Sequence, residues 1–389
     1  MRGAWRLSLA ALVVVAFGAR CGDSGGPAGI SLALVSVGLA HTCAVTIDGV
    51  PYCWGENFNG QLGLGDTVDR TEPQAVGGNV RFGWIGAGFA HSCGLTAAGL
   101  AYCWGRNDRA QLGVGDTLFR ATPTAVAGAL AFRSLSVGAL HNCGLTAAGA
   151  AYCWGWNGFG QLGDGTTSPR TTPVAVSGGL SFTAVSAGMG FFIGAHTCGV
   201  ATADSTVHCW GANFNGELGD GTTVSHATPA RVVGGQRFVG VWAGGLHSCG
   251  LVAGAGPNAY CWGDNANGEL GDGSTTDRLI PVPVSGGLVF TSLSAGLAHV
   301  CGLVAGGTIR CWGWNLLGQL GDGSMTDRTV PTLVSGALSF TAPTAGGVHT
   351  CGMAGVAYCW GSNESGQLGD GSVTNSPAPV RVAGQATPK

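Results

Sequence analysis

The stretch that decides the fold runs from His91 to Asp116. It reads His91-Ser92-Cys93-Gly94-Leu95, Ala101-Tyr102-Cys103-Trp104-Gly105, Asn107, Gln111-Leu112-Gly113 and Asp116. Its Cys-Trp-Gly triplet occurs seven times, with the tryptophan at Trp54, Trp104, Trp154, Trp210, Trp262, Trp312 and Trp360, at intervals of 50, 50, 56, 52, 50 and 48 residues. A period of about 50 residues indicates an array of similar supersecondary units, stacked to bury one continuous core.

A second cysteine precedes each triplet, and its spacing predicts a β-hairpin. If Cys93 lies opposite Cys103 in an antiparallel pair, Thr96 faces Leu100 and three residues remain for the loop, ending in Gly99. Glycine suits a loop position that needs a positive φ. Cysteine separations of 8 and 12 residues predict the same three-residue loop with strands one pair shorter or longer, whereas the separation of 11 in the fourth repeat needs a four-residue loop.

This register predicts one disulfide in every repeat. Directly opposed residues of an antiparallel pair have Cα atoms about 4.5–5.5 Å apart, and a disulfide needs about 4.4–6.8 Å. The predicted pairs are Cys43 with Cys53, Cys93 with Cys103, Cys143 with Cys153, Cys198 with Cys209, Cys249 with Cys261, Cys301 with Cys311, and Cys351 with Cys359. The alternative is a zinc site in each repeat, since a histidine precedes each first cysteine. One repeat offers only three such side chains, however, and its two cysteines can bond to each other.

The rest of each repeat reads as short strands and turns. Segments such as Leu34 to Gly38 are β-type, Gly160 to Thr166 has turn chemistry, and Pro173 opens a last segment that suits an edge strand. No window shows helical amphipathicity. Seven units of about four strands predict an all-β fold, a seven-bladed β-propeller of four-stranded antiparallel blades.

Composition excludes one class of function and sets the domain bounds. The chain has 389 residues, a net charge of −3, 10% charged residues and a single lysine, Lys389. The basic surface of a nucleic-acid-binding protein is therefore missing. Residues 30–384 hold the repeats as one domain, and residues 385–389 form a short tail.

The N-terminal segment predicts export. Residues 1–21 carry Arg2 and Arg6 before an apolar run of 11 residues, Leu7 to Phe17, which suits a signal peptide and is too short to span a bilayer. Cys21 lies outside the seven pairs, and residues 22–29 read as a flexible tether. The arrangement resembles a bacterial lipoprotein start with lipidation at Cys21, although Arg20 stands where such sites have a small residue. The alternative is cleavage near Gly18 or Ala19 and a free thiol. Both place the chain in the cell envelope or outside the cell, where disulfides persist.

The repeat resembles that of the regulator of chromosome condensation family. The resemblance rests on Gly38-Leu39-Ala40-His41, on residues 52–66 (Tyr-Cys-Trp-Gly-Glu-Asn-Phe-Asn-Gly-Gln-Leu-Gly-Leu-Gly-Asp) and on Pro73, and it recurs seven times. It implies a seven-bladed propeller. The family's best-known member is a chromatin-bound exchange factor for the GTPase Ran, a role that export and the absent basic tail argue against here. A secreted bacterial beta-lactamase inhibitor of similar propeller type implies that such a repeat can bind proteins outside the cytoplasm.

Residues present in every repeat are expected to serve the scaffold. The seven histidines, His41, His91, His141, His196, His247, His299 and His349, are expected to bond to a neighbouring strand. Asp164 and its equivalents predict Asx-turns rather than Ca²⁺ ligands. Arg70, Arg120, Arg170, Arg278 and Arg328 are expected to brace the same loop.

Function is expected where the repeats differ, in the turn after each Trp-Gly. The candidate partner-binding residues there are Trp156, Trp314, Phe58, Phe159, Phe214, Leu316 and Arg109. Aromatic residues and arginine dominate binding hot spots, and large apolar side chains on turns usually contact something. Trp156 and Trp314 are expected to be the most exposed, whereas the three phenylalanines have an alternative in which they fold over the blade edge.

The resulting hypothesis is an extracytoplasmic scaffold that binds a protein or another envelope macromolecule through a propeller face. Nucleic acid is not an expected partner, the membrane is reached only through a lipid at Cys21, and no cofactor, metal or catalytic residue is predicted. The alternatives are a lyase-like or glycosidase-like enzyme with a site in the axial channel, and a purely structural surface protein. The ends should close the ring, with residues 377–382 beside residues 32–38.

Overall fold

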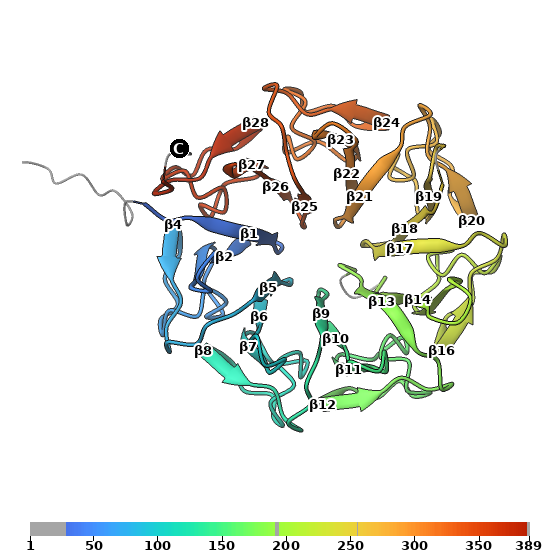
Figure 1. Cartoon of the computed structure of the whole chain (residues 1–389), viewed down its shortest axis with the longest axis horizontal. Coiled ribbons are helices and arrows are strands. Elements are labelled where there is room, and N and C mark those ends of the chain that lie inside the picture. Colours follow the sequence, from blue (N-terminus) through green and yellow to red (C-terminus); the bar gives the residue numbers. More distant parts are fainter. Residues whose placement is uncertain (1–28, 191–193, 255, 387–389) are drawn as a thin grey trace, which may run out of the picture.

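Seven four-stranded sheets stand like blades around a central axis in the computed structural model (Figure 1). The structure describes residues 29–190, 194–254 and 256–386. The predicted signal peptide, Cys21 and nearly all of the predicted tether lie outside these residues. Each blade consists of four consecutive antiparallel strands, with the first strand nearest the axis and the fourth at the rim. The predicted fold class is confirmed.

The strand bounds repeat from blade to blade. Blades 1 and 2 contain β1 (Leu32–Val37), β2 (His41–Thr46), β3 (Pro51–Gly55), β4 (Arg70–Ala75), β5 (Trp84–Ala87), β6 (His91–Leu95), β7 (Ala101–Gly105) and β8 (Arg120–Ala125). Blades 3 and 4 contain β9 (Ser134–Val137), β10 (His141–Leu145), β11 (Ala151–Gly155), β12 (Arg170–Ala175), β13 (Phe182–Ala187), β14 (His196–Ala201), β15 (Val207–Gly211) and β16 (His226–Arg231). Blades 5 to 7 contain β17 (Phe238–Ala243), β18 (His247–Val252), β19 (Ala259–Gly263), β20 (Arg278–Pro283), β21 (Phe290–Ala295), β22 (His299–Val304), β23 (Thr308–Gly313), β24 (Arg328–Leu333), β25 (Pro343–Ala345), β26 (His349–Ala354), β27 (Val356–Gly361) and β28 (Ser376–Arg381).

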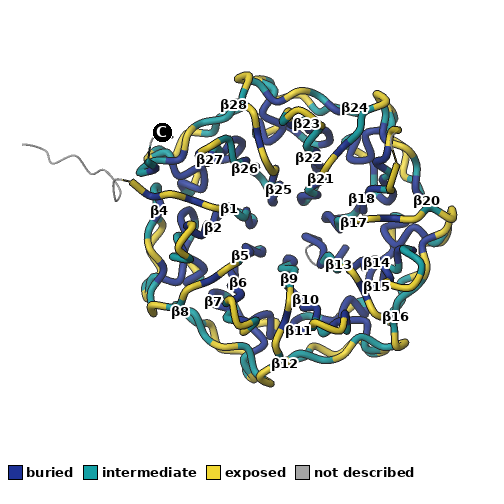
Figure 2. Tube along the Cα trace, in the orientation of Figure 1, coloured by how far each residue is buried: buried dark blue, intermediate teal, exposed yellow. Residues whose placement is uncertain are grey.

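The second and third strands of each blade are joined by the predicted disulfide. Cys93 pairs directly with Cys103 in the β6–β7 ladder, and their Cα atoms lie 4.1 Å apart. The other six predicted pairs are bonded in the same way: Cys43 with Cys53, Cys143 with Cys153, Cys198 with Cys209, Cys249 with Cys261, Cys301 with Cys311, and Cys351 with Cys359. The zinc alternative is therefore wrong, because the sulfurs are used within the hairpin. These central strands are buried, and the outer strands are partly exposed (Figure 2).

The hairpin loops follow the prediction except in two blades. Blade 2 has the three-residue loop, since Thr96 N–H donates to the carbonyl of Leu100, and blade 4 has the four-residue loop. In blade 5 the pairing stops at Val252 and Asn258, because Pro257 has no N–H to continue the ladder. In blade 7 the strand ends lie on either side of Gly355, whose φ is +74°. The three-residue prediction is wrong for these two loops.

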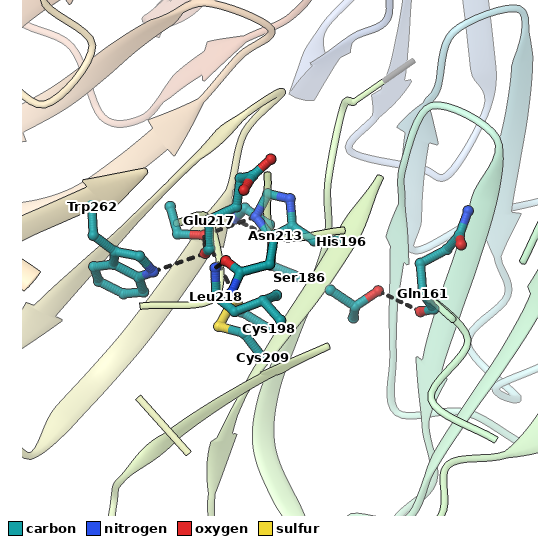
Figure 3. The surroundings of a disulfide bond; sticks show 12 residues. Gln161, Ser186, His196, Cys198, Cys209, Asn213, Glu217, Leu218 and Trp262 are labelled. Carbon is teal, nitrogen blue, oxygen red and sulfur yellow. Dashed lines mark hydrogen bonds between the residues drawn. A yellow bond between two sulfur atoms is a disulfide. The ribbon is translucent and has the colours of Figure 1, made fainter. Parts of the chain in front are cut away.

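Each repeated tryptophan packs into the preceding blade. Trp104 of blade 2 clusters with Leu62 and Phe82 from the segments that follow β3 and β4 of blade 1, and its Nε1–H donates to the carbonyl of Gln61 at 2.9 Å. Trp262 bonds to the carbonyl of Glu217 in the same way (Figure 3). The core therefore lies mainly between blades, with one cluster at each interface.

The seven histidines form a buried belt that links the blades, as expected for scaffold residues. His141 Nε2 donates to Thr197 Oγ1 of the next blade at 2.8 Å, and this hydroxyl donates to the carbonyl of Gln161. The residue after each histidine supplies the acceptor: Thr42, Ser92, Asn142, Thr197, Ser248 and Thr350. Burial lowers the pKa of His141 to about 3, so the ring stays neutral. Val300 interrupts the belt, and the buried Nε2 of His247 has no hydrogen-bond partner.

A second ring, made of backbone, runs around the axis. The turn between the first and second strands of each blade donates one N–H to the next blade, as Ala139 does to the carbonyl of Gly188. The seven donors are Leu39, Phe89, Ala139, Met189, Gly245, Leu297 and Gly347. An axial glycine lies beside each of these donors, and a Cβ atom there would collide with a carbonyl of the next blade. The seven axial glycines are Gly38, Gly88, Gly138, Gly188, Gly244, Gly296 and Gly346. These glycines are therefore required by close approach.

The two ends of the chain close the ring, as predicted. Leu32 and Val37 of blade 1 pack in one cluster with Val380 and Val382 at the end of blade 7. Ile30 forms a parallel bridge with Gln385, and Ala386 N–H donates to the carbonyl of Ile30. The contacts thus reach into the predicted tail, residues 385–389.

Replacing an axial glycine should destabilise the protein strongly. A Cβ at Gly88 would lie 2.5 Å from the carbonyl oxygen of Gly138, whereas at Gly83 the nearest atom would be 3.9 Å away. Gly88→Ala should lower the free energy of unfolding by about 1–3 kcal/mol or more, and Gly83→Ala should change it little. Equal midpoints for both variants in chemical denaturation would contradict the close-approach argument.

Completing the histidine belt should stabilise the protein. Val300→Thr supplies the hydroxyl that Thr350 supplies one blade later, so it should raise the free energy of unfolding by about 0.5–1.5 kcal/mol. The matched variant Thr350→Val should lower it by about 1–3 kcal/mol, because it leaves the buried His299 Nε2 without its partner and removes one of the two hydrogen bonds to the Gln319 carbonyl. A loss of stability in Val300→Thr would show that the apolar packing of residue 300 matters more than the missing bond.

Candidate binding face

The loop between the third and fourth strands of each blade is held by one buried asparagine. Asn57 Nδ2 donates to the carbonyls of Asp66 and Val68, and its Oδ1 accepts from Leu62 N–H at 2.9 Å. The equivalent residue is buried in every blade: Asn57, Asn107, Asn157, Asn213, Asn265, Asn315 and Asn363. Because one side chain ties both arms of the loop together, the loop tips are held in place before any partner arrives.

An aspartate braces the second arm of this loop. Asp164 Oδ1 accepts from the N–H and hydroxyl of Thr166, and Asp164 Oδ2 lies 2.6 Å from the Arg170 guanidinium. Burial alone would raise the pKa of Asp164, but the bonds from Thr166 and Arg170 outweigh it and hold the pKa below its ordinary value. The Asx-turn and the bracing arginine are both confirmed.

A buried glutamine or glutamate supports the first arm. Gln61 Oε1 accepts from Asn59 N–H, and Glu217 Oε2 accepts from Asn215 N–H, each at 2.8 Å. The position holds Gln61, Gln111, Gln161, Glu217, Glu269, Gln319 and Gln367. Glu217 Oε1 is buried and has no hydrogen-bond partner. Burial raises the pKa values of Glu217 and Glu269 to about 7.

The residue after the buried asparagine points outward in blades 1, 4 and 6. Phe58 is 79% exposed, Leu316 60% and Phe214 53%. The alternative in which Phe58 folds over the blade edge is therefore wrong. Arg109 is also exposed, and its Nε lies 3.8 Å from Asp108.

The residue before the asparagine turns partly inward, so Trp156 and Trp314 are half-buried and not fully exposed. The expectation that they are the most exposed candidates is wrong. The physical reason is visible in blade 1, where Glu56 at this position accepts a bond from Gln61 Nε2 inside the loop. Side chains at this position lie beside the buried glutamine, a geometry that the sequence pattern does not reveal.

Trp156, Phe159 and Phe214 form an aromatic cluster across blades 3 and 4. Phe159 lies edge-on to both neighbours, with ring centroids 5.3 Å from those of Trp156 and Phe214. Edge-to-face pairs at this distance are favourable. The structure thus brings three of the predicted residues together, whereas Phe58, Arg109, Trp314 and Leu316 lie on the loops of other blades.

The same loop has a second exposed tip, which was not among the predicted site residues. Val68, Leu118 and Phe119 are 61%, 66% and 58% exposed. Val224, Met325 and Val373 occupy the same part of their loops and are also exposed. The sequence signal for this tip is an apolar residue between the turn aspartate and the start of the fourth strand.

The two kinds of tip meet between blades 1 and 2. Gly65 N–H of blade 1 donates to the carbonyl of Ala121 in β8, which places the loop of blade 1 over the rim of blade 2. A groove of about 630 Å³ results, lined by Phe58, Asn59 and Thr67 from blade 1 and by Arg106, Asn107, Asp108, Thr117, Leu118 and Phe119 from blade 2. We call this the loop groove. Arg106 and Asp108 pair within it at 2.5 Å.

The axial channel has a different lining. A hollow of about 540 Å³ is bordered by small, apolar and hydroxyl residues and by Trp84 and Trp242, without a carboxylate. The paired acids that the enzyme alternative requires are therefore not at this hollow. Within residues 29–190, 194–254 and 256–386, no three His, Cys, Asp or Glu residues are grouped to hold a metal. The same described residues contain no helix long and apolar enough to cross a membrane.

Comparison with known families follows the blades. The sequence profile of the regulator of chromosome condensation (RCC1) repeat matches residues 48–95, 148–193, 204–251, 258–303, 307–353 and 354–387. A second profile of the same repeat matches residues 33–61, 85–111, 132–161 and 290–319. The chain belongs to this repeat family. The repeat was recognised from sequence, and the profiles confirm it.

Individual relatives share short segments with this RCC1-repeat chain. The ultraviolet-B receptor UVR8 of Arabidopsis thaliana is 48% identical over 48 residues, which are 12% of this chain and 11% of the receptor. The human E3 ubiquitin-protein ligase HERC2 is 36% identical over 102 residues, which are 25% of this chain and 2% of the ligase. The matched segments thus cover a small part of these relatives.

Solved structures share the fold over most of the chain. Human WBSCR16 has a TM-score of 0.73 at 21% identity, over 84% of this chain and 87% of that one. Yeast Prp20p, from Saccharomyces cerevisiae, has a TM-score of 0.70 at 22% identity, over 81% and 80%. The ectodomain of the Physcomitrella patens receptor kinase CR4 has a TM-score of 0.55 at 23% identity, over 86% and 74%. At these identities the likeness shows the fold alone.

The two buried glutamates should make folding stability depend on pH. Between pH 4.5 and about 7 the unfolded chain ionises them while the folded chain keeps them protonated, so their contribution to stability falls as the pH rises. The double variant Glu217→Gln with Glu269→Gln, which installs the residue of the other blades, should therefore be more stable at pH 8. We expect a gain of about 1–3 kcal/mol for each site. Chemical denaturation at pH 8 and pH 4 measures it.

The gain should shrink toward zero at pH 4, where both glutamates are protonated in either state. The buried histidines are the same in both proteins, so their pH dependence cancels in the comparison. An equal gain at the two pH values would show that the amide acts through hydrogen bonding and that the buried charge has no cost.

Proposed function

We propose that this protein is an extracytoplasmic scaffold that binds a macromolecular partner, in the first place a protein, through the face formed by the loops between third and fourth strands. The observation that supports this most is the placement of exposed apolar side chains. Phe58, Leu118, Phe119, Phe214 and Leu316 all stand on these loops, each more than half exposed. Large exposed apolar groups gathered on one face favour an interaction site.

The rigidity of the loops supports the same function. Each tip is held by the buried asparagine and the aspartate brace, so little conformational entropy is lost when a partner docks. The loop groove combines aromatic walls with a paired arginine and aspartate, and aromatic residues and arginine are enriched at the centre of protein interfaces. Trp156 and Phe159, which are half-buried, contribute more to the shape of the face than to contact.

Cysteine chemistry supports the proposed location. Seven disulfides indicate an oxidising compartment, because cytosolic thiols are kept reduced. The signal-type segment 1–21 and lipidation at Cys21 complete the proposal and would tether the propeller to an envelope membrane.

The solved relatives supply a precedent of the same kind. One solved structure contains Kap60 bound to the yeast propeller Prp20, and Prp20p also binds Gsp1p and histones. The receptor kinase CR4 carries a propeller of this fold in its ectodomain. For this chain we propose only protein binding and an extracytoplasmic position. Nucleic acid is left out as a partner because the chain's net charge of −3 does not complement the negative charge of the phosphate backbone.

Substitution of Phe58 should separate binding from folding. Phe58→Ser removes an aromatic side chain that is 79% exposed in the loop groove. The control, Ile47→Ser, removes an equally exposed side chain from the β2–β3 hairpin, at the opposite end of β3. Purified protein that lacks residues 1–28 is immobilised and incubated with envelope proteins. Bound partners are then cross-linked to it and identified by mass spectrometry. Affinity for the partner found with the parent protein should fall by about 1–3 kcal/mol in Phe58→Ser and stay unchanged in Ile47→Ser.

A partner lost only in Ile47→Ser would move the interface to the hairpin face and contradict the proposal. A parent protein that retains no envelope protein above the level of a denatured control would also contradict it. Circular dichroism of both variants should match the parent, because neither side chain belongs to the inter-blade core.

A further inference from the structure

Two positions of the innermost strand, four and two residues before the axial glycine, border the axial hollows in most blades. In most blades both are small or carry a hydroxyl. The pairs, from blade 1 to blade 7, are Leu34 and Ser36, Trp84 and Gly86, Ser134 and Ser136, Ala184 and Ser186, Gly240 and Trp242, Ser292 and Ser294, and Ala342 and Thr344. Only blades 2 and 5 place an aromatic residue there.

In both of these blades the tryptophan is accommodated by a glycine on the same strand. A Cβ at Gly240 would lie 2.6 Å from Cη2 of Trp242, and a Cβ at Gly86 would collide with Cη2 of Trp84. Each indole therefore lies over the strand where another blade has a side chain. The order is reversed between the two blades, so the two rings start from different heights along the axis. Their strands, β5 and β17, face each other across the axis in Figure 1.

Both tryptophans border the same hollow of about 540 Å³, together with Ser136, Ser186 and Thr291. Both are half-buried, so part of each indole remains accessible. The volume matches a site for a small molecule. None of the lining residues carries a charge. A charged ligand would lose its hydration there without gaining an opposite charge, which favours a neutral one.

Hydroxyl groups continue the hollow along the axis. The Oγ atoms of Ser36, Ser136 and Ser186 accept the N–H of the next blade at 2.9–3.1 Å. A hydroxyl carries one proton and can accept two bonds, so each of these O–H groups is left to donate. A smaller hollow of about 140 Å³ is lined by these serines with Ser294 and Thr344.

We propose that the axial hollow binds a neutral sugar ring in contact with Trp84 and Trp242. The apolar C–H faces of a pyranose suit indole surfaces, and its hydroxyls suit the serine and threonine ring, whereas a purely apolar ring would leave those hydroxyls without a partner. The site is separate from the loop groove, since no residue lines both. The inference does not depend on the proposed protein partner.

The repeat itself provides substitutions that should fold. Trp242→Ser installs the residue that blades 1, 3, 4 and 6 carry at this position, and Trp84→Ser installs the residue of blades 3 and 6. Isothermal titration calorimetry of the parent protein with glucose, galactose and N-acetylglucosamine should show saturable binding of at least one neutral sugar. Affinity should drop at least about tenfold in each serine variant and stay unchanged in Phe58→Ser.

Three outcomes would overturn the proposal. The first is no binding of any neutral sugar to the parent protein at millimolar concentrations. The second is binding that both serine variants retain. The third is that glucuronate or indole binds more tightly than the neutral sugars in a tryptophan-dependent way, which would assign the hollow to an anionic or a purely apolar ligand.

Discussion

One backbone hydrogen bond, repeated at every blade interface, sets the geometry of the whole molecule. The turn between the first and second strands of each blade donates to the next blade beside an axial glycine, and the last bond runs from Gly347 of blade 7 to Gly38 of blade 1. Such close approach admits no side chain at the glycine. The ring therefore closes on the same contact that builds each interface, and no strand has to be exchanged between the ends.

The other repeated residues act outward from this ring. The histidine belt lies in the second strands, the disulfide joins the second strand to the third, and the tryptophan of the third strand fills the interface with the preceding blade. All of these groups are buried in every blade. Residue type varies from blade to blade mainly at the two loop tips on one face and at the two axial positions of the first strand. Those are the places that we assign to binding.

Much of this organisation could be predicted from sequence because its signals are local. Cysteine spacing indicates the hairpin register, and opposed Cys93 and Cys103 follow from it. The period indicates the number of blades, and the family resemblance indicates their arrangement. The finer geometry depends on directions that spacing does not encode. Trp156 turns inward and Phe58 outward although each lies next to the buried asparagine of its loop. Leu118 and Trp242 were missed because their role depends on the neighbouring blade and on the axis, which no single repeat defines.

The most direct test of the ring is native-state hydrogen exchange at the seven donor amides. If the backbone ring holds the fold together, the amides of Leu39, Ala139, Leu297 and Gly347 should exchange only through global unfolding, with the same free energy as the amides of the disulfide-linked strands. The Gly347 amide should be as protected as that of Ala139, although it spans the junction of the two chain ends. Rapid exchange of Gly347 and Leu39 at conditions where Ala139 stays protected would show that the ring opens at its junction, and would contradict the account.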